Sequence, residues 1–351
     1  MNDTPLGEQR RSSRRSALAR AAATAIAAAA FGGSLATPAA AQPAPTPAEL
    51  NYPTRPIEMI VAFAPGGGTD LVARLLARYL EKQLGGNASI VVLSKPGAGG
   101  AIGFGELARA APDGYTLGFL NTPNLLTIPI ERKSTFTWRS FDLIGNLVDD
   151  PDAFAVHNSS SIDSLASLAK YAKAHPGEVT VGTTGTGSDD HLAMLLFEKA
   201  TGTRLNHIPY KGAGEVRASI AGQQIVIGAI NVGEVLQFQK GGTPIRFLGQ
   251  MGAKRSVLAP DVPTFHEQGF DIELASLRGL GAPKGLPEGI RRKLVDAMAR
   301  VVKDPDFQKQ AEAMFAPLRY LAPEAYGAEL ALGESGFRQL WKDMPWQELK
   351  P

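Results

Sequence analysis

Apolar and polar residues follow a repeating pattern along this chain from Tyr52 onward. Short apolar runs, such as 59–63, alternate with longer stretches in which apolar residues recur every three or four positions, such as 70–84. This alternation is typical of βαβ units around a parallel sheet, so the sequence predicts an α/β fold. The expected strands are 58–63, 89–93, 116–120, 141–147, 153–157, 179–182, 206–209, 225–230, 245–250 and 278–282, and the expected helices are 70–84, 102–110, 164–174, 190–201, 214–221, 288–302, 305–313 and 323–342.

A charged segment that contains a proline, 149–152 (DDPD), separates the first group of elements from the second. We expect the chain to cross there from one lobe to another and to return near 271–276. The sequence therefore predicts two α/β lobes joined by a hinge, with 52–150 and 276–351 in lobe 1 and 151–275 in lobe 2. The 310 residues from 42 to 351 also suit two lobes better than one.

The N-terminal segment is typical of an export signal. Arginines within 10–15 precede an Ala-rich stretch, 17–35, and a small-residue cleavage site ends at Ala41. The string SRRSAL is similar to a twin-arginine signal, although the general secretory route stays open. We expect residues 1–41 to be removed, 42–51 to form a Pro-rich leader, and the mature protein to be periplasmic.

Composition and charge narrow the function further. The first 41 residues hold five Arg and two acids, so the rest carries 31 basic and 32 acidic residues, and no basic stripe indicates nucleic acid. The absence of Cys excludes disulfides, thiolate metal sites, Cys nucleophiles and a lipoprotein anchor. No G-x-S-x-G, Gly-Lys or metal-type His spacing occurs, so we expect no enzyme, cofactor or metal site. No segment after the signal is long and apolar enough for stable membrane insertion.

Two Gly-rich turns carry the candidate chemistry. The turn APGGGTD (64–70) follows an apolar run and precedes an amphipathic stretch, and TTGTGSDD (183–190) repeats the arrangement. A strand, Gly-rich turn and helix direct backbone amides and the positive helix end at a small anion. Thr183, Thr184, Thr186 and Ser188 add hydroxyl donors.

The acids and the histidine beside these turns have simpler interpretations. Asp70 is expected to cap its helix, and Asp189 and Asp190 are expected to complement the helix dipole while pointing outward. His191 is either a packed helix residue or a ligand contact. A third Gly-rich connection, 96–105, misses the dinucleotide-binding spacing and is interpreted as a structural turn.

The chain resembles the periplasmic solute-binding proteins of tripartite tricarboxylate transporters, the Bug-type receptors. The resemblance covers 52–326 and rests on motifs in the same order: YPTRPIEMIVAFAPGGGTDLVARLLARYL, KPGAGGAIGFGELARAAPDGYTLGF, TGTGSDDHLAMLLFEKATG, HIPYKGAGEVRASIAG, LAPDVPTFHEQGF and GLGAPKGLP. It implies two Rossmann-like lobes in a clamp of the type II periplasmic-binding-protein kind. It also implies a monomer that captures a small organic carboxylate and delivers it, through transient contact, to transporter membrane subunits.

The resemblance also implies which residues meet the ligand. The two Gly-rich turns would hold one carboxylate, partly through ordered water, and residues at strand ends would meet the rest of the ligand. The turn residues are Ala64, Pro65, Gly66, Gly67, Gly68 and Thr69, with Thr183, Thr184, Gly185, Thr186, Gly187 and Ser188, and the remaining candidates are His191, Asn121, Thr122, Asn231 and Arg278.

Arg278 departs from the family pattern, in which many members have an aromatic pair before the glycine that corresponds to Gly279. Because Arg binds carboxylates in a bidentate manner, we hypothesise that Arg278 pairs with a second ligand carboxylate. This favours a di- or tricarboxylate, with an aromatic acid as a further candidate. The alternative is that Arg278 forms a surface or inter-lobe salt bridge.

Two other functions remain open on the sequence. The same clamp serves equally as a ligand-sensing receptor for a membrane sensor kinase. A weaker alternative is an enzyme built on this fold.

Overall fold

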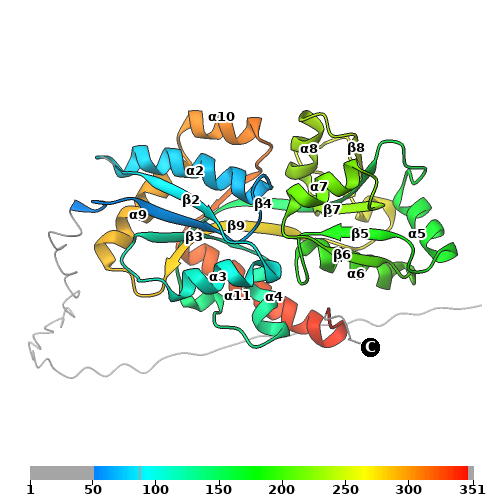
Figure 1. Cartoon of the computed structure of the whole chain (residues 1–351), viewed down its shortest axis with the longest axis horizontal. Coiled ribbons are helices and arrows are strands. Elements are labelled where there is room, and N and C mark those ends of the chain that lie inside the picture. The colour runs from blue at the N-terminus through cyan, green and yellow to red at the C-terminus, as the bar shows by residue number, and fades with distance from the viewer. Residues whose placement is uncertain (1–50, 87, 347–351) are drawn as a thin grey trace, which may run out of the picture. The chain divides into compact units, whose positions relative to one another are not determined.

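The computed structural model describes residues 51–86 and 88–346. The predicted signal and all but the last residue of the predicted leader lie outside these residues. Within them the chain alternates strands and helices as expected for an α/β protein (Figure 1). The elements are β1 (Ile57–Val61), α2 (Gly68–Leu84), β2 (Ile90–Ser94), η1 (Ala98–Gly100), α3 (Ala101–Arg109), β3 (Thr116–Asn121), α4 (Asn124–Glu131), η2 (Trp138–Ser140), β4 (Phe141–His157), α5 (Leu165–Ala174), β5 (Thr180–Thr183), α6 (Asp189–Thr201), β6 (Asn206–Pro209), α7 (Ala213–Ala221), β7 (Ile227–Asn231), α8 (Val232–Lys240), β8 (Ile245–Gln250), η3 (His266–Gln268), β9 (Ala275–Pro283), α9 (Glu288–Val301), α10 (Pro305–Ala313), β10 (Leu318–Leu321) and α11 (Pro323–Asp343).

The strands of the first lobe lie in the order β2-β1-β3-β9-β4, with β10 paired to β4. β1 is parallel to β2 and β3, whereas β9 is antiparallel to both β3 and β4. Helices α2, α9 and α10 cover one face of this sheet, and α3, α4 and α11 cover the other (Figure 1). Strand β1 is nearly all apolar and mostly buried, because helices cover both faces of the sheet there.

The second lobe continues the sheet through β4, β7, β5 and β6, and β8 pairs with the other edge of β4. β5 is parallel to β6 and β7, and β4 is antiparallel to β7 and β8. Helices α7 and α8 lie on one face, and α5 and α6 lie on the other (Figure 1). The carboxyl ends of these parallel strands therefore lead directly into helix N-termini, as in open α/β sheets generally.

Strand β4 contradicts the prediction of a break at 149–152. It runs without interruption from Phe141 to His157 and pairs with β9 through the segment DDPD, where Pro151 lies opposite Ala275. The expected strands 141–147 and 153–157 are thus one strand. The prediction failed because Asp150 and Asp152 are buried and bonded within the fold instead of marking a solvated loop.

Buried side chains form four clusters, one in the first lobe and three in the second. One comes from residues 52–148 together with 280–330, and the others come from residues 153–272. Aromatic pairs lie in each, such as Phe104 with Phe136 in the first and Phe154 with Phe265 in the second. Each lobe therefore has its own core, while β4 and β9 run between them.

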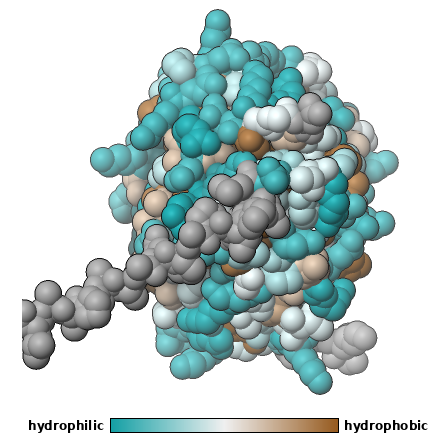
Figure 2. All heavy atoms as spheres, turned by 90° about the vertical axis from the view of Figure 1, so that its left-hand side faces the viewer, coloured by the Kyte–Doolittle hydropathy of each residue, from teal (hydrophilic) through white to brown (hydrophobic). Residues whose placement is uncertain are grey.

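The surface at the end that carries β2 and α9 is mostly hydrophilic, with apolar residues scattered over the uncovered part of the face (Figure 2). Scattered apolar residues are normal for a protein surface. A search of the described residues finds no helix with the length and hydropathy of a membrane span.

Candidate functional site

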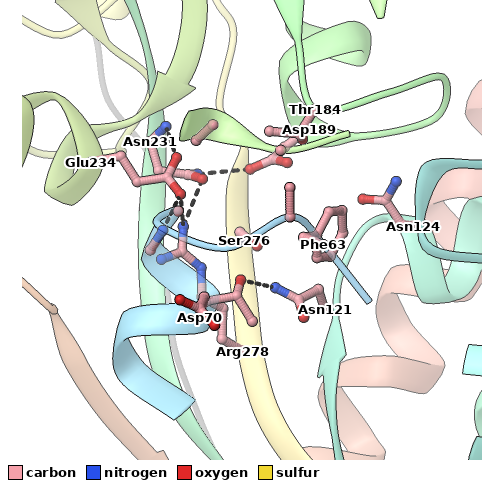
Figure 3. A pocket seen from close by; sticks show the side chains of 16 residues that line it. Phe63, Asp70, Asn121, Asn124, Thr184, Asp189, Asn231, Glu234, Ser276 and Arg278 are labelled. Carbon is pink, nitrogen blue, oxygen red and sulfur yellow. Dashed lines mark hydrogen bonds and ion pairs between the residues drawn. The ribbon is translucent and has the colours of Figure 1, made fainter. Parts of the chain in front are cut away.

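A small cavity lies where helix N-termini of both lobes meet the ends of β3 and β9 (Figure 3). Lobe 1 contributes the first Gly-rich turn and the strand ends, and lobe 2 contributes the starts of α6, α7 and α8. Its volume of about 30 Å³ is room for about two water molecules. The lining residues are Phe63, Ala64, Gly67, Gly68, Thr69, Asp70, Asn121, Asn124, Thr184, Asp189, Gly212, Ala213, Asn231, Glu234, Ser276 and Arg278.

The structure brings about half of the predicted site residues to this cavity. Those that line it are Ala64, Gly67, Gly68, Thr69, Asn121, Thr184, Asn231 and Arg278. Those that do not are Pro65, Gly66, Thr122, Thr183, Gly185, Thr186, Gly187, Ser188 and His191. Lining residues that the sequence reasoning did not assign to the ligand are Phe63, Asp70, Asn124, Asp189, Gly212, Ala213, Glu234 and Ser276.

The first Gly-rich turn begins α2 with Gly67 as the N-cap residue and without a side-chain cap. The Asp70 carboxylate instead accepts a hydrogen bond from the amide of Gly66 at 3.1 Å and pairs with Arg74 at 2.9 Å. A Cβ atom at Gly68 would lie 2.3 Å from Nη1 of Arg278, so only glycine fits there. The turn thus needs glycine for close approach to side chains, as well as for its backbone path.

The N-terminus of α2 already holds a carboxylate of this chain. The amide of Gly68 donates to Oε1 of Glu234 at 2.8 Å, although the two residues belong to different lobes. Glu234 lies in the first turn of α8, where it forms a capping box with Asn231. The pattern Asn-x-x-Glu at 231–234 was a readable helix-start signal, but nothing in it indicated that the carboxylate reaches the other lobe.

The second Gly-rich turn also surrounds a carboxylate of this chain. Oδ2 of Asp190 accepts from the amide of Thr184 at 2.7 Å, from its hydroxyl at 2.5 Å and from the hydroxyl of Ser188 at 3.3 Å. The prediction that Asp189 and Asp190 point outward is wrong, because they are only 4% and 0% exposed. The turn donors and the start of α6 hold these charges inside the protein.

Other predicted residues of this segment support the turn instead of lining the cavity. His191 is buried, its Nδ1 accepts from the amide of Gly187 at 3.1 Å, and its ring stacks on His207 at 3.9 Å. Burial holds the pKa of His191 well below its usual value, so the ring is neutral.

Thr122, another predicted site residue, lies behind the site, where its hydroxyl accepts from the amide of Leu277 at 3.0 Å.

Arg278 is buried at the cavity wall, where its Nη2 contacts groups of this chain and its Nε has no hydrogen-bond partner among the described residues. Its Nη2 lies 3.3 Å from Asp150 and 3.7 Å from Glu234, and it donates to Oδ1 of Asn231 at 2.7 Å. Figure 3 shows Arg278, Glu234, Asn231 and Asp189 as a linked row of side chains along one side. This arrangement is the inter-lobe ion pair that the sequence analysis kept as the alternative.

The acids around the cavity are costly to keep ionised. Burial is the main cause that raises the pKa of Asp150 to about 7 and that of Asp189 to about 6. Burial and the neighbouring carboxylates also raise the pKa values of Asp152 and Asp190 well above the usual range. Any further negative charge placed here therefore meets a field that already disfavours anions.

Direct contacts join the two lobes on either side of the cavity. The amide of Ala64 donates to the carbonyl oxygen of Lys211 at 3.0 Å. The hydroxyl of Thr127 donates to the carbonyl oxygen of Gly187 at 2.7 Å. Together with the Gly68–Glu234 bond, they describe a closed clamp around a nearly filled cavity.

Free hydrogen-bond donors nevertheless remain in the lining. Among the described residues, the amides of Gly67 and Thr69 at the start of α2 and of Ala213 at the start of α7 make no hydrogen bond. A Cβ atom at Gly67 would lie 3.6 Å from the amide nitrogen of Ala213, so the two helix starts face each other closely. Converging amides of this kind bind anions. No group of His, Asp and Glu suited to a metal ion occurs in the described part of the chain.

Comparison with known proteins places the chain in a family. The model of the tripartite tricarboxylate transporter family receptor matches residues 72–317, more than half of the chain. The chain belongs to this receptor family. Protein BugT of Bordetella pertussis is 38% identical to this receptor over 238 residues, which are 67% of this chain and 72% of that protein.

Solved structures agree with the family and with the α/β clamp. The periplasmic binding protein BugD is 31% identical, with a TM-score of 0.79 over 84% of this receptor and 99% of that chain. Rpa4515 of R. palustris with adipate is 26% identical, with a TM-score of 0.78 over 83% of this receptor and 98% of that chain. The receptor shares the fold of both structures, of which BugD is described as a periplasmic binding protein.

Proposed function

We propose that this receptor captures a small organic carboxylate between its two lobes in the periplasm and delivers it to the membrane subunits of a tripartite tricarboxylate transporter. The proposal rests on two helix starts with free amides that line one inter-lobe cavity. Gly67 and Thr69 supply the amides at the start of α2, and Ala213 supplies the amide at the start of α7. Such amides suit a carboxylate because they donate without bringing a counter-charge of their own.

The family, a structural neighbour and the N-terminal sequence also support this proposal. The family carries the name of a tripartite tricarboxylate transporter, a neighbour of the same fold is solved with the dicarboxylate adipate, and the N-terminal sequence is typical of export. A di- or tricarboxylate is therefore the first class to test. The receptor acts as a monomer by binding and releasing, and its contact with the membrane subunits is transient.

Binding has to change the contacts that close the clamp. About 30 Å³ does not hold an organic acid, so the ligand enters an open form and takes over the role of Glu234 in joining the lobes. A ligand shifts an open–closed equilibrium only through contacts that differ between the two states. The amides of α2 and α7 supply such contacts because they belong to different lobes.

A thermal-shift screen of mono-, di- and tricarboxylates, followed by calorimetry, tests the proposal. A ligand that binds only the folded receptor raises the unfolding temperature by mass action. We expect Gly67→Val to abolish the shift because its methyl groups would cover the amide of Ala213. Gly336→Val is the matched control, because a Cβ atom there meets nothing within 4 Å.

Two further readouts separate delivery from other functions. Mass spectrometry of the recovered ligand should show it unchanged, which distinguishes binding from catalysis. Uptake of the labelled acid should stop when either the receptor or the membrane subunits are deleted. Failure of every carboxylate to raise the unfolding temperature would refute the proposal.

A further inference from the structure

We propose that Trp346 is a positioning residue, which holds the second Gly-rich turn (183–190) against lobe 1 and so keeps the clamp closed. The inference goes beyond the proposed function, because it concerns closure itself and does not depend on which ligand binds. It assigns a role to a residue that lies after α11 and outside the residues matched by the family model.

The second Gly-rich turn meets lobe 1 at three successive residues, 185–187. A Cβ atom at Gly185 would lie 3.1 Å from the Cα atom of Gly99, and one at Gly99 would lie 2.9 Å from the carbonyl oxygen of Thr186. Gly99 belongs to the third Gly-rich connection, 96–105, which was predicted to be a structural turn. Its left-handed backbone (φ 65°) and its missing side chain let the two turns touch. The third connection is therefore part of the lobe 1 surface on which the second turn rests.

Gly187, the last of these three residues, is contacted by side chains of both lobes. From its own lobe, Nδ1 of His191 accepts from its amide at 3.1 Å. From lobe 1, the hydroxyl of Thr127 donates to its carbonyl oxygen at 2.7 Å, and Nε1 of Trp346 lies 3.5 Å from its Cβ position. Its φ of 79° is one that residues with side chains rarely adopt, so glycine is needed here. The backbone of the turn is thus fixed at this residue from both lobes.

Trp346 is itself held in lobe 1 by contacts with two other residues. Its Nε1 donates to Oε2 of Glu131 at 3.2 Å, and its ring packs edge-to-face on Trp341 with 4.6 Å between the centroids. Glu131 ends α4, has a side chain only 3% exposed, and pairs with Arg132 at 2.7 Å. These contacts give the indole a fixed place in lobe 1, from which it meets the turn of lobe 2.

Trp346 also lies beside lobe 2 beyond the turn. A hollow of about 420 Å³ is lined by Pro345 and Trp346 together with residues of α6 and of 204–207. Trp346 is only 1% exposed in this closed arrangement. Opening the clamp would draw α6 and the turn away from the indole and expose part of it to water. Because exposing aromatic surface to water is unfavourable, burial of Trp346 favours the closed state.

The turn that Trp346 contacts carries residues of the inter-lobe cavity. Thr184 and Asp189, on either side of 185–187, line that cavity, whereas Trp346 does not. Trp346 therefore acts on the site through the turn. Loosening the turn from lobe 1 should move both lining residues together.

Hydrogen–deuterium exchange of the purified receptor, without any ligand, tests the inference. We expect Trp346→Ala to speed amide exchange in 184–188 by about tenfold, because the turn then spends more time away from lobe 1. Small-angle X-ray scattering should report a larger radius of gyration for the same variant. Trp138→Ala is the matched control, since its indole also donates to a carboxylate, that of Glu334 at 2.8 Å, but both residues belong to lobe 1. It should change neither the exchange in 184–188 nor the radius of gyration.

The outcomes separate positioning of the turn from general stabilisation. Wild-type exchange in 184–188 for Trp346→Ala overturns the inference, and so does an equal rise for Trp138→Ala. A rise that extends to β7 in the core of lobe 2 shows a loss of fold and also overturns it. Trp346→Leu, which lacks both the ring and the N–H group, gives an independent reading if the alanine variant does not fold, and it too should speed exchange in 184–188. The proposed function is tested with ligands and this inference without them, so each can fail alone.

Discussion

Replacing Gly68 by alanine adds a single methyl group at the point where the two lobes meet. Its carbon would lie 2.3 Å from Nη1 of Arg278 and 2.9 Å from Oε1 of Glu234, whereas ordinary contacts begin near 3.4 Å. Arg278 cannot easily move away because it is buried and bonded to Asp150 and Asn231. We therefore expect Glu234 to leave the amide of residue 68 and the closed clamp to weaken.

The expected magnitude follows from the contact that is lost. A hydrogen bond to a charged group contributes about 1.5–3 kcal/mol, so its loss lowers the closing equilibrium by about 10- to 140-fold. The helix itself should gain about 0.5–1 kcal/mol, because alanine loses less conformational entropy than glycine. Because this gain is smaller than the loss, closure and fold stability should both decrease.

Three measurements on Gly68→Ala check this reasoning. Small-angle X-ray scattering should report a larger radius of gyration without ligand, and calorimetry a tighter affinity, because the ligand no longer has to displace Glu234. Urea denaturation should report a lower stability. Gly336→Ala is the matched control, since it lies in α11 with nothing within 4 Å of its Cβ position. It should raise stability without changing affinity. If Gly68→Ala keeps the wild-type dimensions and affinity, the Gly68–Glu234 contact does not hold the clamp closed.

The remaining predictions concern charge and cleft contacts. Burial raises the pKa of Asp150 to about 7 and of Asp189 to about 6, so the native state holds protons that the unfolded chain releases above about pH 4. Stability should therefore fall as the pH rises from about 4 to about 7, and equal calorimetric midpoints at pH 5 and pH 8 would contradict this. Arg278→Ala strands buried carboxylates and should cost about 3–5 kcal/mol in urea denaturation. Arg255→Ala, whose ion pair is half-exposed, should cost less than about 1 kcal/mol, and equal losses would show that burial is not the cause. Thr127→Val removes a hydrogen bond across the cleft and should weaken ligand affinity by about fivefold, for about 1 kcal/mol, with unchanged affinity as the contrary result.

Local sequence patterns predicted most of the fold because each strand and helix carries its own periodicity. The bounds of β6, β8 and α10 agree with the expected 206–209, 245–250 and 305–313. Helix α4 was missed because it is apolar on most sides and contains Pro129, and β10 because four residues give little pattern. Helix α8 was missed because it follows β7 without any turn residue between them.

The site was harder to predict than the fold. The Gly-rich turns were found because they are local motifs, and both contribute to the cavity. The acids that control its charge, Asp150, Asp189 and Glu234, come from three separate elements and meet only through tertiary packing. Each of them alone is an ordinary first-turn or strand residue. The sequence therefore indicated that an anion is held, but not that the surrounding wall is itself negative.

The uninterrupted strand β4 determines how this receptor can move. Because β4 and β9 stay hydrogen-bonded through Pro151 and Ala275, the connection between the lobes is a two-stranded ribbon. Opening must bend or twist that ribbon, and it works against an elastic restoring torque that grows with the angle. The pairing of β4 with β9 has register shifts between Leu143 and Gly145 and between Asn146 and Val148, and we expect the ribbon to deform first there. The range of opening is then set by how far the paired ribbon deforms before its hydrogen bonds break. The lobes therefore move by bending the whole ribbon instead of rotating about a single hinge residue.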